Sequence, residues 1–528
     1  MPHTTRAGPM AALLGLALGC LALGPALGWG FVLAQDMVFV PDPAFSRFTF
    51  GLAGGAPRVV PSDAVVTALS WVIPGELVQK AILLGVFVLG CSGAALLVPS
   101  ESLAPRLVAG AFYVWNPYVA ERLLMGQWAL LLGYAGLPWV VGAMVSGRRL
   151  AVAIVPAAVG GFAAMTITAL TALPLALTGT RRWMGTLRTG AIVVAFSLPW
   201  LLVAALRPGG VTGDGVGVEA FAARADGPFG AVGSLLSLGG IWNSHAVPAG
   251  YDTLPGAVAR LALAVAGIAG FALLGRVAYR RGLAVAAAVG FAIACLGVTE
   301  PGRAVLTWLI GVWGGFAVFR DAQQFVAPLA LLVAVGLGLL TASAASAPAV
   351  ASVARRAPAW AGVMVLVPLA VLPTLAWGAA GALRAVNYPA DWTAAREVIR
   401  RDGEPGDILV LPFESYRRFP WNGHRAVLDP AQRFFAVPGR DVVANDTVRV
   451  GSMVVGSEDG RARQVERVLV EPSPNLLRAG FRYVVVDAGT PDERRVFEGW
   501  LRAATLVVDG ADLRLYRLDR ATGQGASE

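Results

Sequence analysis

The sequence predicts an α-helical, multi-pass membrane protein that ends in a smaller α/β domain. Of its 528 residues, 56% are hydrophobic and only 14% are charged, whereas an ordinary soluble domain carries about 25% charged residues. Several separate windows have no charged residue, and crossing a bilayer takes roughly 20 apolar residues. These windows are residues 81–100, 129–147, 151–180, 282–299 and 357–383. From about residue 384 charges become frequent and apolar runs shorten.

The formal net charge of +9 has a topological explanation, and no nucleic-acid partner is expected. Arginine pairs stand in short loops between apolar segments, as in the cytoplasmic loops of membrane proteins. The pairs are Arg148 with Arg149, Arg181 with Arg182, Arg280 with Arg281, and Arg355 with Arg356. With these pairs and the N-terminus in the cytoplasm, we expect about 11 spans. The C-terminal domain is then extracytoplasmic.

Three segments of the membrane domain, residues 1–383, are not expected to cross as simple helices. The first span, about residues 11–33, opens into a long outer loop in which residues 64–73 predict a re-entrant or interfacial helix. Residues 150–180 are too long for one span and predict two short helices. Residues 304–319 are apolar but short, so we expect them to re-enter. If residues 304–319 crossed the membrane fully, Arg355 and Arg356 would face outward, against the rule that arginines face the cytoplasm.

Residues 384–528 are predicted to form the α/β domain. The runs 407–413, 481–489 and 513–518 have the composition of strands. A helix is expected from near Asp391 to a stop at Gly403, and another over residues 492–504. This alternation favours an α/β arrangement. Neither a GxGxxG sequence nor a P-loop follows the strands, so nucleotide binding is not predicted.

Ionisable residues near the span ends are the candidates for chemistry, because charge at membrane depth is costly. Asp36 stands just after the first span, and Asp42 follows it in the same loop. On composition alone, Asp36 is a carboxylate solvated at the headgroup level. A second group lies in WNPYVAERLLMGQW, residues 115–128, whose aromatic residues are also typical of an interfacial belt.

The segment FRDAQQF, residues 319–325, offers a phosphate ligand. The planar guanidinium of Arg320 suits phosphate oxygens. Alternatively, Arg320 pairs with Asp321 or extends to the lipid headgroups. His245, in a long glycine-rich outer loop, has the residue type that titrates near neutral pH, although a single loop histidine is commonly a surface residue.

The layout resembles the GT-C glycosyltransferases, integral membrane enzymes that take sugars from polyprenyl-phosphate donors. In that family an essential acidic residue opens a long first outer loop, and Asp36 stands at the matching position. VPDPAFSRFTFG, residues 40–51, and AGAFYVWNPYVAERLLMGQWALLLGYAGLPWVV, residues 109–141, look like the membrane part of actinobacterial arabinofuranosyltransferases. The resemblance covers the membrane region by layout but only a few dozen residues by motif.

The resemblance implies transfer of a sugar from a polyprenyl-phosphate donor to a cell-envelope glycan or lipid-linked acceptor, at the outer face of a bacterial plasma membrane. Such a reaction needs a base for the acceptor hydroxyl, if it inverts, and cations for the leaving phosphate. The candidates are Asp36 and Asp42 for catalysis, Arg320, Asp321 and Arg122 for the donor phosphate, and Glu121, Gln127, Trp128 and His245 for the sugar or acceptor.

No metal ligand is predicted, because the D-x5-D spacing of Asp36 and Asp42 is not the compact DxD of some relatives. A divalent metal is compatible with the chemistry, and the cofactor is left open. Two other functions are also open. A transporter or flippase of lipid-linked sugars expects charges near the bilayer midplane and two related halves. A non-catalytic glycan-assembly protein predicts that Asp36→Asn leaves function intact.

Overall fold

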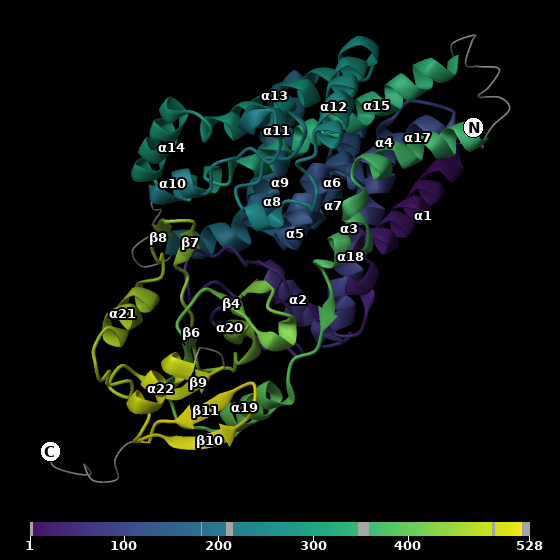
Figure 1. Cartoon of the computed structure of the whole chain (residues 1–528). Helices are drawn as coiled ribbons and strands as arrows, with labels where there is room; N and C mark the ends of the chain where they lie inside the picture. Colours follow the sequence, from purple (N-terminus) through teal and green to yellow (C-terminus); the bar gives the residue numbers. More distant parts are fainter. Residues whose placement is uncertain (1–3, 181, 207–214, 347–357, 488–490, 520–528) are drawn as a thin grey trace. The chain divides into compact units, whose positions relative to one another are not determined.

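In a computed structural model of the chain, the structure describes residues 4–180, 182–206, 215–346, 358–487 and 491–519. The chain forms two compact units, each built from segments that are distant in sequence. The first comprises Met1–Gly28, Gln79–Leu202 and Gly213–Arg384, and the second comprises Trp29–Val78, Val203–Thr212 and Ala385–Glu528. The long loop after the first helix is thus grouped with the C-terminal residues (Figure 1).

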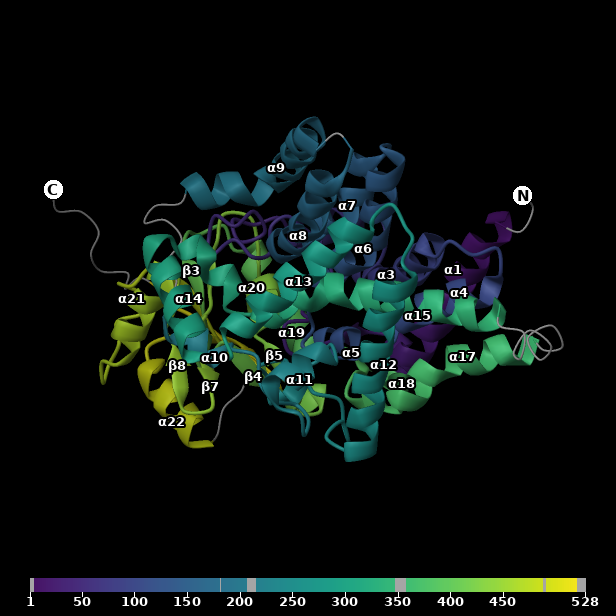
Figure 2. The same cartoon turned by 90° about the horizontal axis from the view of Figure 1, so that it is seen from above.

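The first unit is organised around the buried helix α15 (Ala327–Ser346). Its neighbours include α4 (Leu103–Val114), α12 (Leu254–Leu274) and α13 (Arg280–Leu296). α12 and α15 cross closely (Figure 2), and a Cβ atom added at Gly336 would lie 1.8 Å from the carbonyl oxygen of Gly267. Small residues permit such close approach between membrane helices, so glycine is required at this crossing by space alone.

The other helices before residue 384 are mostly apolar. In chain order they are α1 (Thr4–Leu23), α2 (Ser62–Ser70), α3 (Gly75–Leu97), α5 (Pro117–Leu124), α6 (Trp128–Ser146), α7 (Leu150–Gly160), α8 (Phe162–Thr178), α9 (Arg182–Leu206), α10 (Val216–Ala220), α11 (Gly230–Leu236), α14 (Glu300–Val312), α17 (Pro358–Val371) and α18 (Ala376–Gly381). The two short helices expected in residues 150–180 are present as α7 and α8, which break at Gly161.

Among the described residues, six helices are long and apolar enough to cross a membrane, or seven if a bent pair counts as one span. The bent pair is α13 with α14, which meet at 94°. The chain is therefore a multi-pass membrane protein. The expected total of about 11 spans stays a prediction, because some expected spans are shorter helices here. Arg181, Arg355 and Arg356 lie outside the described residues.

The second unit contains a five-stranded sheet in the order β10–β11–β9–β3–β6. The strands are β3 (Asp407–Leu411), β6 (Val442–Val443), β9 (Phe481–Val486), β10 (Thr505–Asp509) and β11 (Arg514–Arg517). β3 is parallel to β6 and β9, whereas β11 is antiparallel to β9 and β10. β3 and β9 are apolar along nearly their whole length, as expected for strands covered on both faces.

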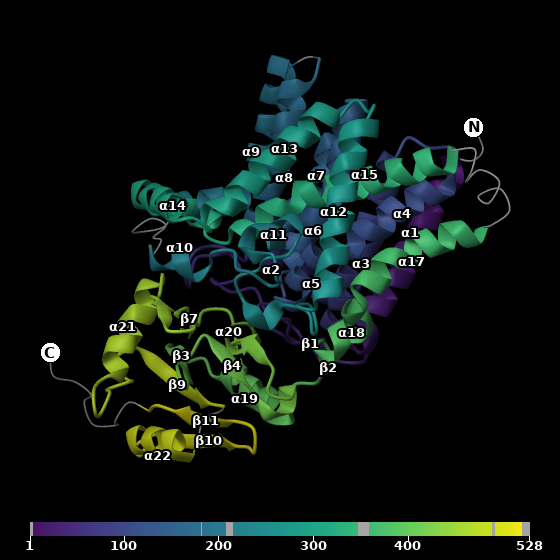
Figure 3. The ribbon, with the colours of Figure 1, turned by 45° about the horizontal axis from the view of Figure 1, so that its top comes forward.

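Helices complete this unit (Figure 3). α21 (Gly460–Leu469) and α22 (Pro491–Trp500) supply Val465 and Phe497 to the hydrophobic core on one face of the sheet. α19 (Ala390–Arg401) contacts β10 and β11. Strands therefore occur within the three runs predicted from sequence, and helices occur near Asp391 and over residues 491–500.

The first loop is built into this unit through short ladders. β1 (Phe31–Val32) pairs with β2 (Ala385–Val386). Gln35 forms a β-bridge with Val427 of β5 (Ala426–Leu428), which itself pairs with β4 (Tyr416–Arg418). Arg433 of α20 (Ala431–Phe434) donates to Asp63 of α2 at 2.7 Å. β7 (Val448–Val450) and β8 (Met453–Val455) form a further hairpin. N-terminal loop and C-terminal chain thus share backbone and side-chain hydrogen bonds.

Candidate functional site

The first unit holds a buried polar network centred on α5. Asn116 begins this helix: its side chain accepts a hydrogen bond from the Val119 N–H group, and Pro117 occupies the first turn, where its missing N–H is not needed. The helix carries Glu121 and Arg122 side by side, and both are fully buried. Buried charges require partners, so the partners of these two side chains define the site.

Arg122 uses all five of its N–H groups on protein side chains. Its Nη1 and Nη2 atoms donate to the two carboxylate oxygens of Asp321 at 2.5 and 2.9 Å. Its Nε donates to Oε1 of Gln323 at 2.8 Å, and the remaining donors reach Gln323 and Gln127. This fork geometry fixes the guanidinium plane. Arg122 would therefore have to release one of these partners to bind a donor phosphate.

Glu121 lies beside a second acidic residue, Asp226. Its Oε2 accepts hydrogen bonds from the Ile241 N–H group at 3.2 Å and from Gln323 Nε2 at 3.3 Å. Burial, and then the neighbouring Asp226 carboxylate, raise the pKa of Glu121 well above its usual range, although Arg122 opposes this. The raised pKa favours the neutral form of the Glu121 carboxyl group compared with an exposed glutamate.

Three oxygen atoms converge beside Gly239. A Cβ atom added there would lie 2.3 Å from Asp226 Oδ2, 2.7 Å from Tyr251 Oη and 2.9 Å from Glu121 Oε1. Glu121 Oε1 and Tyr251 Oη are buried, and these side chains interact with Asp226 and with Arg260, respectively. This buried group of hydrogen-bond donors and acceptors is a candidate site for binding hydroxyl groups.

Tyr251 is held in place from one side of its ring. The guanidinium carbon of Arg260 lies 3.6 Å from the ring centroid, a cation–π contact. Burial, and then the charges of Asp226 and Glu121, raise the pKa of Tyr251 well above its usual range. Its hydroxyl group therefore stays protonated and can donate a hydrogen bond.

The other predicted residues of this unit have different surroundings. Arg320 is buried, its Nε donates to the Ala317 carbonyl at 3.2 Å, and its guanidinium carbon lies 5.5 Å from the Phe221 ring centroid. Trp128 is buried at the start of α6. His245 is exposed, with Nδ1 3.3 Å from the side-chain oxygen of Asn243. The structure thus joins Glu121, Arg122, Gln127 and Asp321 in one network and leaves His245 at the surface.

Asp36 belongs to the second unit and sits in a tight turn. The backbone groups of Ala34 and Met37 bond to each other at 2.9 and 3.4 Å, and Gln35 has a φ of 49°. The Tyr416 hydroxyl of β4 donates a hydrogen bond to Asp36 Oδ1. Burial, and then the Asp36 charge, raise the pKa of Tyr416 well above its usual range. Tyr416 therefore remains a hydrogen-bond donor to Asp36.

Backbone hydrogen bonds also attach this turn to β5. The Gln35 N–H group donates to the Ala426 carbonyl at 2.7 Å, and the Leu428 N–H group donates to the Gln35 carbonyl at 2.8 Å. Asp42, the second predicted catalytic residue, has a side chain that is 88% exposed, with Oδ2 3.6 Å from Arg396 Nη2. Exposed ion pairs contribute little to the stability of a fold. Of the two carboxylates, Asp36 has the more fixed position.

Comparison with known proteins finds similarity among solved structures. No protein-family model and no curated protein matches the chain. A search of solved structures finds a cryo-electron microscopy structure of a mutant of the mycobacterial arabinofuranosyltransferase AftD. The fold of this chain is similar to that of AftD. The TM-score is 0.58 at 17% sequence identity, and the match covers 97% of this chain but 41% of the AftD chain.

The similarity to AftD confirms, at the level of the fold, the resemblance to arabinofuranosyltransferases seen in the sequence. It extends over both units, since nearly the whole chain is matched. The chain spans less than half the length of AftD. At this sequence identity the comparison shows a shared fold.

Among the residues described, no group of three or more His, Cys, Asp or Glu side chains could hold a metal ion.

The residues that sequence reasoning missed in this AftD-like fold are Asp226, Tyr251 and Gln323. Gln323 lies within the FRDAQQF segment, so its position was accessible from the sequence even though its role was not. Asp226 and Tyr251 stand in a long loop rich in glycine, and no fixed spacing relates them to Glu121. Only the folded chain brings Asp226, Tyr251 and Glu121 together.

Proposed function

We propose that this protein is a membrane glycosyltransferase that moves a sugar from a polyprenyl-phosphate donor to a cell-envelope glycan or lipid-linked acceptor. The observation that carries the proposal is the AftD-like fold over 97% of the chain. Because AftD is named as an arabinofuranosyltransferase, arabinofuranose is the first sugar to test. The proposed setting is a bacterial plasma membrane with the second unit on its extracytoplasmic side.

In this proposal Asp36 is the general base. The acceptor oxygen forms a bond to the anomeric carbon of the donor sugar while the bond from that carbon to the phosphate oxygen breaks. The proton of the acceptor hydroxyl passes to Asp36, and the polyprenyl phosphate leaves with the bonding electrons. The Tyr416 hydrogen bond and the anchored turn support this role, because a base must be held within reach of the proton it removes.

The network around Glu121 is proposed to bind sugar hydroxyl groups. The raised pKa of Glu121 favours a neutral carboxyl group that can donate, the Tyr251 hydroxyl is a second donor, and Asp226 supplies an acceptor. Arg122 positions Asp321 and Gln323 rather than contacting the donor directly. Arg320 remains the proposed ligand of the leaving phosphate, since a cation there stabilises the charge that develops.

The decisive experiment compares Asp36→Asn with Asp42→Asn at matched protein levels. Membranes containing each variant receive a polyprenyl-phosphoryl arabinofuranose donor and a short arabinan acceptor, and product formation is measured. Loss of a general base typically costs about 10²- to 10⁴-fold, so we expect that loss for Asp36→Asn. Asp42→Asn should stay within a few-fold of wild type, because this side chain is exposed. Full activity of Asp36→Asn would remove Asp36 as the base.

The same assay separates the alternatives. A wild-type protein that carries lipid-linked arabinofuranose across sealed vesicles without forming product would favour the transporter. Product formation by wild type but equally by Asp36→Asn would leave transfer intact and move catalysis to another carboxylate.

A further inference from the structure

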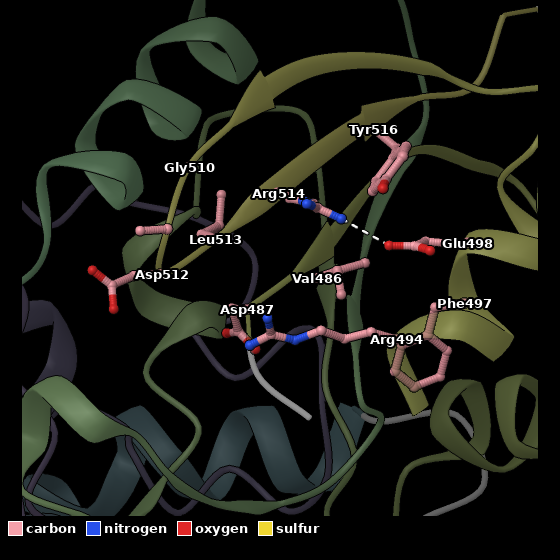
Figure 4. A pocket seen from close by; sticks show the side chains of 11 residues that line it. Val486, Asp487, Arg494, Phe497, Glu498, Gly510, Asp512, Leu513, Arg514 and Tyr516 are labelled. Atoms are coloured by element: carbon pink, nitrogen blue, oxygen red, sulfur yellow. Dashed lines mark hydrogen bonds and ion pairs between the residues drawn. The ribbon is translucent and has the colours of Figure 1, made fainter. Parts of the chain in front are cut away.

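The second unit contains a small pocket next to the end of β9. Its volume is about 260 Å³, and its lining comes from β9, α22, β11 and the turn before β11. Figure 4 shows the side chains around it. None of the residues assigned to sugar transfer lines this pocket.

The pocket lies at the carboxyl end of β9, where this strand meets the start of the antiparallel strand β11. Asp487 is the residue that directly follows β9.

Asp487 is a buried carboxyl group with an unused oxygen. Its side chain is 0% exposed, and its Oδ1 accepts a hydrogen bond from Arg417. Arg417 also lies 3.4 Å from Asp429, so one guanidinium serves two buried carboxyl groups. Asp487 Oδ2 has no hydrogen-bond partner in the part of the chain that the structure describes. Burial raises the pKa of Asp487 to about 7, with Arg417 opposing and Asp429 reinforcing the effect.

The lining combines both signs of charge with aromatic rings. Asp487, Glu498 and Asp512 supply carboxyl oxygens, and Arg494 and Arg514 supply donors. Arg514 donates to Glu498 at 2.8 Å, and Figure 4 shows Arg494 reaching along the pocket with its guanidinium end beside Asp487. Phe497 and Tyr516 provide the apolar surface.

This composition selects among ligand classes. A phosphate would face three carboxyl groups, and a metal ion or amine would face two guanidinium groups, so either meets repulsion. Sugar hydroxyls both donate and accept hydrogen bonds, and the faces of a sugar ring suit aromatic side chains. The volume is below the roughly 300–1,000 Å³ of pockets for drug-sized ligands, which favours one sugar residue.

We propose that the pocket formed by Asp487, Arg494, Glu498 and Arg514 binds a single neutral sugar residue of a glycan. The inference goes beyond the proposed transfer reaction and does not depend on it, because a glycan-binding pocket requires no catalysis. Arg417, which also contacts Asp429, holds the Asp487 side chain in place.

The test uses saturation-transfer-difference NMR on the full chain in detergent micelles. The probes are methyl α-arabinofuranoside and methyl α-mannopyranoside at millimolar concentration, each with and without inorganic phosphate. The informative variant is Arg494→Ala, because Arg494 is exposed and its removal leaves the core intact. The matched control is Arg495→Ala, since Arg495 is 76% exposed, pairs with Asp492 and does not line the pocket.

We expect the wild-type signal of at least one glycoside to fall several-fold in Arg494→Ala and to persist in Arg495→Ala. Another sugar site on the protein contributes equally to both variants, so their difference reports on this pocket. Asp487→Asn, used if its melting temperature matches wild type, should also lose the signal. The proposal is overturned by absent binding in wild type, by equal signals in both arginine variants, or by phosphate displacing the glycoside from wild type.

Discussion

Tyr416 donates a hydrogen bond to Asp36 across 380 residues of sequence. The two side chains meet because the turn that carries Asp36 is hydrogen-bonded to β5, the partner strand of β4. A carboxylate that opens an N-terminal loop is thereby held by a hairpin of the C-terminal chain. The position of the proposed base is set within the second unit rather than by the helix that precedes it.

Replacing Tyr416 with Phe should lower transfer activity without unfolding the unit. The backbone bonds of the turn remain, and only one hydrogen bond to a charged group is lost. Such bonds contribute about 1.5–3 kcal/mol, so kcat should fall about 10- to 100-fold with little change in KM for the donor. The control is Tyr483→Phe, which removes a 2.7 Å hydrogen bond to Asp402 in the same unit. Equal kinetic effects of the two variants would contradict a specific role for Tyr416.

Replacing Glu121 with Gln should make the protein less sensitive to rising pH. Glu121 has a raised pKa in the folded protein, so the unfolded chain ionises first as pH rises. Wild-type stability therefore declines above the ordinary Glu pKa of 4.5, by at most about 1.4 kcal/mol per pH unit until the folded pKa is reached. Gln keeps the shape and a donor but cannot ionise.

Thermal unfolding of the purified protein between pH 5 and 8 measures this effect. The melting temperature of Glu121→Gln should rise relative to that of wild type at each step upward in pH. The melting temperature of Glu101→Gln, changed at an exposed position, should follow that of wild type. Parallel curves for wild type and Glu121→Gln would show that Glu121 is ionised in the folded state.

Replacing Gly239 with Ala should disturb the oxygen cluster directly. The new methyl group would lie 2.3 Å from Asp226 Oδ2, so the loop must shift, and overpacking of this kind costs about 1–3 kcal/mol. Both the melting temperature and the transfer rate should fall. Gly142→Ala is the matched control, because a Cβ there meets nothing within 4 Å. A Gly239→Ala protein with wild-type melting and activity would mean that the cluster is loosely packed.

Replacing Arg122 with Lys should break the network even though the charge is kept. An ammonium group cannot donate in parallel to both oxygens of Asp321 while also serving Gln127 and Gln323. We expect a loss of stability of about 1–3 kcal/mol. A double-mutant cycle with Asp321→Asn measures the coupling, which should exceed about 0.5 kcal/mol for residues in contact. Additive effects would show that the Arg122–Asp321 pair does not act as a unit.

The sequence predicted those features that depend on local patterns. The apolar run of residues 150–180 is too long for one span, and it indeed breaks at Gly161 into α7 and α8. The alternation of strands and helices after residue 384 predicted the secondary structure found around β3 and β9. In each case the spacing of apolar and polar residues carries the information.

The candidate sites were only partly predictable, because their geometry is made by distant segments. Glu121 and Arg122 stood out as adjacent charges in an apolar region. Asp226 and Tyr251 did not stand out, since isolated polar residues in a glycine-rich loop look solvated from the sequence, yet packing buries Tyr251 and half-buries Asp226. The pairing of Asp36 with Tyr416 depends on a turn docking onto a strand, and no periodicity in either segment encodes it.

The division of the second unit between two ends of the chain has a consequence for biosynthesis. A ribosome makes residues 29–78 early and residue 416 only after the whole apolar stretch has been translated. Until then the Asp36 turn has neither the β5 edge nor the Tyr416 hydroxyl to hold it. In a nascent or C-terminally truncated chain the proposed base is therefore not held in place, and the proposed activity requires about the last quarter of the polypeptide.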